Sequence, residues 1–235
     1  MNYQKINDRL QGIWPKINFS QVPFGLDFSN DCLRLIQLTK NRGKKPALRT
    51  YGQINLEPGI IINGEIKNPT KLSEAIKQLL TKTTGEKINT KEVVADLPET
   101  KTFIKMVTFN WPTDNELAQL VTTQSVNKKS EKKGAELKDQ ILHQILIREL
   151  ADDVPINLAE TTLDYHILRG NLKTIKPSEE MKLLVGIAPK KIAEEYAKVI
   201  EDAGLLPVAL EIEGAAITRS IIKKAESKNK LIENI

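Results

Sequence analysis

The chain has 235 residues, of which 28% are charged, 40% hydrophobic and 5% aromatic. This length suggests one large domain or two small ones, at roughly 100–200 residues each. The 35 Lys and Arg against 30 Asp and Glu leave a formal charge of +5, too small and too evenly spread for a nucleic-acid-binding surface. The single cysteine, Cys32, excludes a disulfide framework and a cysteine-rich zinc site.

Residues 1–21 are predicted to be an extension before the folded part. Apolar residues recur there at helical spacing, whereas Gly12 and Pro15 weaken a helix. The favoured interpretation is a terminus folded onto the domain, and the alternative is a segment that contacts a membrane surface or a partner. The segment lacks the apolar stretch of a signal peptide, and no run approaches the ~20 apolar residues of a membrane span. The expectation is a cytosolic protein.

The next segment alternates short apolar runs with turn clusters. Strands are predicted over 24–28, 33–38 and 47–56, and their closeness in sequence favours an antiparallel meander. Asn68 as N-cap and Pro69 at the first position predict a helix that Gly85 ends. A fourth strand is predicted over 92–97.

A second unit is predicted from about residue 100. Its expected elements are strands over 103–109, 161–168 and 181–188 and helices after Thr113 and through 137–150. The polar stretch 124–138 is interpreted as a solvated loop or helix extension, with a basic contact surface as the alternative. A helix over 189–203, a strand over 208–212 and a helix over 214–225 follow. Residues 230–235 resemble the start of a strand, which either closes the domain or indicates a truncated sequence.

Asp27 is the most informative candidate residue. It ends the first predicted strand, where a turn offers the backbone N–H groups of Ser29, Asn30 and Asp31. Such groups form an anion-binding nest, and a neighbouring carboxylate can hold a hydrated Mg²⁺ that bridges phosphates. Asp27, Ser29 and Asn30 are therefore the predicted nucleotide-phosphate and magnesium residues, although hairpin turns also favour Asp, Ser and Asn for local reasons. No P-loop, dinucleotide, zinc-protease or nucleophile-elbow motif occurs, so no catalytic residue and no direct metal ligand is predicted.

The order of three antiparallel strands, a helix, a strand and an inserted unit resembles the first lobe of actin-like ATPases. Within that superfamily the sequence is similar to the PilM family of type IV pilus assembly proteins, which is related to FtsA. The most specific match is the Pro-Gly … Gly-Glu-Ile … Pro pattern within residues 57–69. Residues 24–38 resemble the family's first phosphate motif and following strand, and further similar stretches are 93–98, 154–165 and 204–213.

The resemblance implies an α/β fold of the RNase H-like type. Residues 22–99 and 213–235 would form subdomain IA, and residues 100–212 would form an inserted FtsA-type subdomain IC. The chain would then be truncated before the second lobe. Several features depart from the family pattern: Ser29 replaces a glycine, Arg34 a lysine and Asn157 a proline, Asp96 interrupts the Val-Ala-Leu-Pro strand end, and residues 124–138 look like an insertion. Because glycine lets backbone approach a phosphate closely, Ser29 predicts that binding of ATP and magnesium is weak or lost.

The resemblance also implies a scaffold at the cytoplasmic side of the inner membrane rather than a turnover enzyme. Such a scaffold would recruit the cytoplasmic N-terminal peptide of a PilN-like membrane protein into a groove. The candidate groove residues lie between the third strand and the helix: Ile62, Gly64, Glu65 and Ile66. Pilus motor and platform proteins, and self-association into a ring, are further expected contacts. The alternatives are an FtsA-like cell-division or filament protein, a sugar- or acetate-kinase-like ATPase of the same superfamily, and a nucleotide-free interaction module.

Overall fold

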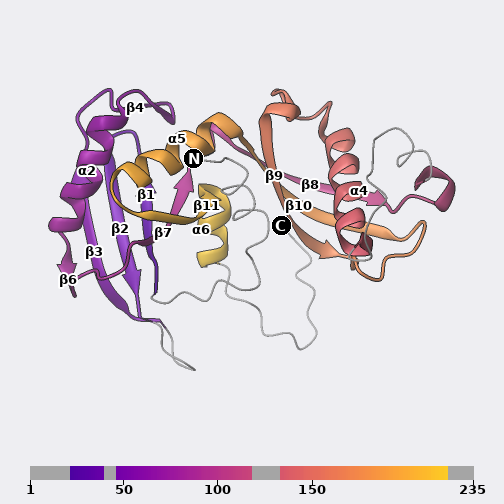
Figure 1. The fold of residues 1–235 in the computed structure, drawn as a ribbon, viewed down its shortest axis with the longest axis horizontal. Coiled ribbons are helices and arrows are strands. Elements are labelled where there is room, and N and C mark those ends of the chain that lie inside the picture. Colours follow the sequence, from indigo (N-terminus) through magenta and orange to yellow (C-terminus); the bar gives the residue numbers. More distant parts are fainter. Residues whose placement is uncertain (1–21, 40–45, 118–132, 222–235) are drawn as a thin grey trace. The chain divides into compact units, whose positions relative to one another are not determined.

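The computed structural model describes residues 22–39, 46–117 and 133–221, with side chains omitted at 133–136 and 218–221. The chain divides into two compact units (Figure 1). The first joins the residues up to Lys101 to those from Ala193 onward, and the second is Thr102–Ile192. The predicted N-terminal extension, the predicted final strand and most of the polar stretch 124–138 lie outside the described residues.

The first unit is built on a six-stranded sheet of order β11-β7-β1-β2-β3-β6. Strands β1 (Phe24–Phe28), β2 (Cys32–Leu38) and β3 (Leu48–Asn55) form an antiparallel meander, which confirms the sequence prediction. Strand β7 (Glu92–Leu97) pairs in parallel with β1, and β11 (Leu206–Ile212) pairs in parallel with β7. The three parallel strands β1, β7 and β11 therefore end at the same edge of the sheet.

Helix α2 (Pro69–Thr81) begins as the sequence predicts, because the Asn68 side chain accepts the Lys71 N–H at 3.0 Å and Pro69 occupies the first turn. Its end differs from the prediction. The helix stops at Thr81, and Gly85 lies in the short strand β6 (Thr84–Gly85), opposite Thr50 of β3. At Gly85 a Cβ would lie 2.3 Å from a backbone oxygen of β3, so this glycine permits close strand approach.

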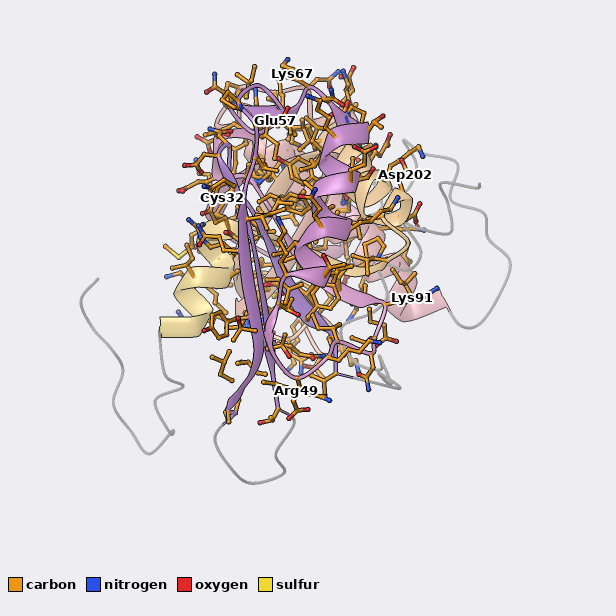
Figure 2. All side chains as sticks on the ribbon, turned by 90° about the vertical axis from the view of Figure 1, so that its left-hand side faces the viewer. Cys32, Arg49, Glu57, Lys67, Lys91 and Asp202 are labelled. Carbon is orange, nitrogen blue, oxygen red and sulfur yellow. The ribbon has the colours of Figure 1, made fainter. Side chains whose placement is uncertain are left out.

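Two further helices belong wholly or partly to this unit. Helix α5 (Lys190–Asp202) contributes its residues from Ala193 onward, and α6 (Glu213–Ile221) follows β11 directly. Helix α2 and helix α6 lie on opposite sides of the sheet, as the view in Figure 2 with β3 toward the reader shows. On α5 the fully buried Tyr196 packs edge-on against Phe28 of β1, with ring centroids 5.1 Å apart. This contact fixes α5 against the strand that leads into the candidate phosphate turn.

A small hairpin that the sequence reading treated as a loop connects β3 to α2. Strands β4 (Ile61–Ile62) and β5 (Glu65–Ile66) pair antiparallel around Asn63 and Gly64, whose φ angles are 49° and 73°. An Asn-Gly pair between short apolar strands is a strong signal for a two-residue hairpin, because both central residues need positive φ. The signal was therefore present in the sequence.

The second unit is a three-stranded antiparallel sheet of order β8-β10-β9 packed on one long helix. Its strands are β8 (Phe103–Asn110), β9 (Thr161–Arg169) and β10 (Glu180–Pro189), and its helix is α4 (Lys133–Leu150) (Figure 1). The helix contributes a buried stripe at the spacing that the sequence predicts: Ile141, Leu142, Ile145, Leu146 and Leu150. Thr113 begins a further helical turn, in which its N–H and hydroxyl donate to the Glu116 carboxylate.

The two compact units do not follow the expected ranges 22–99, 100–212 and 213–235. Residues 193–212 lie in the first unit, because β11 pairs with β7 along its length and the rest of α5 packs on the first core. The second boundary between the compact units thus lies within α5, before β11, rather than after β11. Short 3₁₀ turns, η1 (Glu99–Lys101) and η2 (Leu158–Glu160), lie one in each unit.

Candidate functional site

The predicted phosphate turn joins β1 to β2, and its side chains already have partners. Asp27 Oδ2 pairs with the Arg34 guanidinium at 2.8 Å across the two antiparallel strands. The same guanidinium nitrogen donates to the Ser29 hydroxyl at 3.3 Å. Both members of the ion pair are substantially exposed, at 37% for Asp27 and 51% for Arg34. An exposed pair of this kind is weak and can open to admit a ligand.

The backbone of the turn is less available than the sequence suggests. The Ser29 N–H donates to the Cys32 carbonyl at 3.0 Å, which closes the β1–β2 turn. The Asn30 side-chain oxygen accepts the Gly64 N–H at 3.4 Å and so ties the turn to the β4–β5 hairpin. A phosphate would therefore have to displace a backbone hydrogen bond at Ser29, which weakens the predicted anion nest.

The four candidate groove residues all lie on the β4–β5 hairpin, but they do not share one face. Ile62 and Glu65 are opposite each other in the register, and the Ile62 side chain is 46% exposed. Ile66 instead pairs with the buried Ile61, and Gly64 forms the turn. The structure therefore brings Ile62 and Glu65 together and separates Ile66 from them.

Glu65 is the charged centre of this hairpin. Its carboxylate pairs with Lys101 at 2.7 Å and with Lys67 at 2.6 Å. These two ammonium groups, Lys101 first, lower the pKa of the Glu65 carboxyl to about 2. Figure 2 shows Lys67 at the end of the first unit opposite Arg49. The ion pairs of the Glu65 carboxylate with Lys67 and Lys101 thus help to hold the hairpin at this end of the unit.

Hydrogen bonds from two side-chain hydroxyls to backbone carbonyls also hold the turn of the hairpin. The Tyr196 hydroxyl donates to the Gly64 carbonyl at 3.2 Å, and the Thr100 hydroxyl donates to the Asn63 carbonyl at 3.2 Å. A Cβ at Gly64 would lie 2.6 Å from the Thr100 hydroxyl oxygen and 2.8 Å from Pro98 Cγ. Glycine is therefore required at this position by both its φ angle and the lack of space.

A cluster of three carboxylates lies beside the predicted phosphate turn. Asp27 near the end of β1, Asp96 near the end of β7 and Glu213 at the start of α6 each place one oxygen within 4.8 Å of the other two. Glu213 directly follows β11, so the cluster forms where the carboxyl ends of three parallel strands meet. Sequence reasoning selected Asp27 and noted Asp96 only as a departure from the family pattern. Each of the three residues lies near the end of a strand or directly after one. This shared placement is the sequence signal that could have grouped them into one candidate site.

Asp96 is the buried member of this cluster, with 8% of its surface exposed. Its Oδ1 accepts the Phe28 N–H at 3.0 Å, whereas its Oδ2 is buried and has no hydrogen-bond partner. Burial raises the pKa of the Asp96 carboxyl to about 7; the Phe28 N–H opposes this shift and the negative charge of Asp27 adds to it. Asp96 thus carries an uncompensated charge when it is ionised.

The strand order of the first unit, with a second unit inserted after β7, is that of an α/β fold of the actin-like type, as the sequence predicted. Among solved structures, one described as "PilM-PilN type IV pilus biogenesis complex" superposes with a TM-score of 0.62 at 20% identity over 83% of this chain. The chain spans 48% of the length of that solved chain. This likeness supports the fold.

Residues 25–128 match the family model described as type IV pilus assembly protein PilM. This match confirms the resemblance to that family predicted from the sequence, over these residues. A second solved structure, the cytoplasmic domain of EpsL, an inner membrane component of the type II secretion system of Vibrio cholerae, aligns with a TM-score of 0.45 at 10% identity, over 81% of this chain and 57% of that one. No curated protein matches the chain. In the parts that the structure describes, no helix is long and apolar enough to cross a membrane.

Proposed function

We propose that the chain acts as a scaffold in type IV pilus assembly and binds the cytoplasmic N-terminal peptide of a PilN-like inner-membrane protein. The observation that carries the proposal is the match of residues 25–128 to the PilM family model. The fold shared with a chain of a PilM-PilN complex is consistent with it. The protein would then work at the cytoplasmic face of the inner membrane, beside other proteins of the pilus assembly machinery.

The β4–β5 hairpin is the proposed contact for this peptide. Ile62 offers an exposed apolar side chain on a hairpin whose turn is anchored by Tyr196 and Thr100. A binding surface that is already rigid lowers the entropic cost of binding a flexible peptide, because only the peptide has to be ordered. Glu65 beside Ile62 adds a carboxylate, which favours a peptide with basic residues.

ATP is a proposed but weak ligand of this chain. Asp27 and the β1–β2 turn would face the phosphates and a bound Mg²⁺, which would neutralise the phosphate charge. Two contacts in the turn oppose this binding: the Ser29 N–H is used by the Cys32 carbonyl, and the Asp27 carboxylate is paired with Arg34. In this proposal the nucleotide is not needed to form the turn, because the turn is already closed by its own hydrogen bonds.

A peptide titration tests the scaffold proposal. A fluorescently labelled synthetic peptide with the cytoplasmic N-terminal sequence of the PilN-like protein of the same organism is titrated with the full chain. We expect saturable binding that Ile62→Asp weakens at least tenfold, because the substitution puts a charge into an apolar contact. The matched control is Ile36→Asp on β2, where the side chain is 48% exposed. It should leave the affinity within twofold of the unsubstituted chain.

Two results would count against the proposal. A folded chain that shows no saturable binding would exclude peptide capture by this chain. Equal weakening by Ile62→Asp and Ile36→Asp would exclude the hairpin as the contact. Circular dichroism of all three proteins distinguishes loss of binding from loss of fold.

A further inference from the structure

One face of the β2–β3 pair carries large apolar side chains that are exposed. Tyr51 of β3 lies opposite Ile36 of β2, and Leu48 lies opposite Leu38. The four residues are between 41% and 55% exposed. Because opposite residues of an antiparallel pair project from the same face, the four form one open apolar patch. Apolar residues gathered in this way indicate a contact surface, whereas single exposed ones do not.

The patch faces away from helix α2. A Cβ at Gly52 would lie 3.2 Å from Leu79 of α2, so Gly52 faces the helix. Its neighbour Tyr51 must project from the other face, since side chains alternate along a strand. Helix α6 lies on that other side of the sheet, but it packs on β11 and β7 (Figure 2). In the part of the chain that the structure describes, the patch is therefore open to solvent.

The chain that precedes β1 leads away from a point beside this patch. Gly25 pairs with Ile36, so the residues before Gly25 run toward the end of β2. There the Gln37 side-chain nitrogen donates to the Val22 carbonyl at 2.7 Å, which holds Val22 beside this end of the strand. The Gln37 Oε1 is buried and has no hydrogen-bond partner among the described residues. Buried polar atoms are almost always satisfied, and the residues just before Val22 are placed to supply a donor.

We propose that residues 1–21 cover the patch on β2 and β3 of their own chain. Apolar residues recur in this segment every three or four positions, the spacing of an apolar stripe on one helix face: Tyr3, Ile6, Leu10, Ile13 and Ile17. Strands β2 and β3 lie only about 5 and 10 Å from β1. The five-residue step from Ile17 to Val22 spans up to about 18 Å, so the stripe can fold back onto both strands.

Two other occupants fit the patch less well. Residues 222–235 follow α6, which packs over β11 and β7, and from 222 to 230 they include one large apolar residue, Ile222. A second copy of the chain would need a far larger surface than four side chains, because stable interfaces bury about 1,200–2,000 Å². A tethered segment needs less, since its effective concentration is high. The inference is independent of the proposed peptide contact on the β4–β5 hairpin.

Trp14 makes the segment observable, because the other tryptophan of the chain, Trp111, is buried. Acrylamide quenching of fluorescence is measured on the full chain, and the signal of the Trp14→Phe chain is subtracted. The difference reports the accessibility of Trp14. A synthetic peptide of residues 1–21 gives the value for an exposed ring. We expect the Stern–Volmer constant of Trp14 in the chain to be at most about one third of the value in the peptide.

Charges placed in the patch should release the segment. Leu38→Asp and Leu48→Asp each put a carboxylate into the apolar contact and should raise the Stern–Volmer constant at least twofold. The matched control is Ile62→Asp on the β4–β5 hairpin, at a residue of similar exposure, and it should leave the constant unchanged. Within the segment, Leu10→Asp on the stripe should act like the patch variants, whereas Gln4→Asp off the stripe should not. Circular dichroism checks the fold of each variant.

Three results would overturn the proposal. A Trp14 that is as accessible in the chain as in the peptide means that the segment does not cover the patch. Release by Ile62→Asp that equals or exceeds release by the patch variants means that the contact lies elsewhere. Protection of Trp14 that disappears on dilution, together with a dimer in sedimentation, means that the segment contacts a second copy of the chain.

Discussion

The hydroxyl of Tyr196 on α5 donates a hydrogen bond to the backbone carbonyl of Gly64, 132 positions earlier in the chain and 3.2 Å away. The same ring packs edge-on against Phe28, the residue whose N–H holds Asp96. One buried side chain therefore touches both the hairpin proposed to bind a peptide and the strand that leads into the predicted phosphate turn. The Asn30 side chain makes a second link between the two, through the Gly64 N–H.

Removing the Tyr196 hydroxyl should loosen the hairpin without unfolding the first unit. Tyr196→Phe keeps the ring against Phe28 but leaves the Gly64 carbonyl without this donor, at a cost of about 1 kcal/mol in the free energy of unfolding. Chemical denaturation measures the cost, and hydrogen exchange measures protection of amides in residues 61–66. The control Tyr51→Phe changes a tyrosine that is 51% exposed and should alter neither. Unchanged exchange of the hairpin in Tyr196→Phe would contradict the assigned role.

Gly64→Ala tests how tightly the hairpin is packed. An alanine there adopts an unfavourable positive φ of 73° and meets Thr100 and Pro98 at less than 3.0 Å. The matched control is Gly59→Ala, where φ is 89° but no atom lies within 4 Å of the added Cβ. We expect Gly59→Ala to cost about 1–2 kcal/mol from backbone conformation alone. Gly64→Ala should cost at least about 1 kcal/mol more, because overpacking is added. Equal losses in the free energy of unfolding of the two variants would show that the side chains around Gly64 move to make room for the added methyl group.

Asp96 should make the folded state less stable as the pH rises. The folded-state pKa, about 7, lies above the unfolded value near 3.9, so the folded protein holds the proton more tightly. The free energy of unfolding is therefore highest at acidic pH with respect to this group. It falls as the pH rises from about 4 to about 7, by at most about 1.4 kcal/mol per pH unit. Urea denaturation in EDTA across this range measures the slope.

The Asp96→Asn variant isolates this contribution. It should flatten the slope between pH 4 and 7 and should be more stable than the unsubstituted chain at pH 8, since no buried charge remains. Asp31→Asn should keep the original slope, because this side chain is exposed. An unchanged slope in Asp96→Asn would mean that other groups produce the pH dependence.

Nucleotide binding is expected to be weak. In calorimetry with Mg-ATP the chain should show no affinity in the micromolar range, because a phosphate must displace the bond from the Ser29 N–H to the Cys32 carbonyl. Ser29→Gly should not bring the affinity into that range, since the same N–H remains engaged. Micromolar binding by either protein would contradict this interpretation of the turn.

Local chemistry alone was enough to predict much of the first unit. The alternation of apolar residues indicated β1, β2, β3 and β7, and the Asn68-Pro69 pair indicated where α2 begins. The fold class followed from the order of these elements together with the family resemblance. The Asn63-Gly64 pair is an equally local signal for the β4–β5 hairpin, but the sequence prediction did not include this hairpin.

Elements whose place depends on distant pairing were harder to assign. The end of α2 was predicted at Gly85, but this glycine serves the approach of β6 to β3, a contact between segments far apart in sequence. Likewise residues 193–212 follow the inserted unit in sequence, yet hydrogen bonding to β7 places β11 in the first sheet. A period-2 pattern reports which face of a strand is buried, and it does not report which neighbour the strand pairs with.

The candidate site shows the same division between sequence and structure. The sequence by itself singled out Asp27, because an acidic residue before a Ser-Asn turn has a local chemical meaning. Only the tertiary structure placed Asp96 and Glu213 beside it, since parallel pairing of β1, β7 and β11 brings together carboxylates that lie 69 and 186 positions further along the chain. The tertiary structure also determines the burial of Asp96, because α6 and the strands packed around this residue exclude solvent from it. Composition and spacing cannot report such a cluster, because its charge density arises from proximity in space.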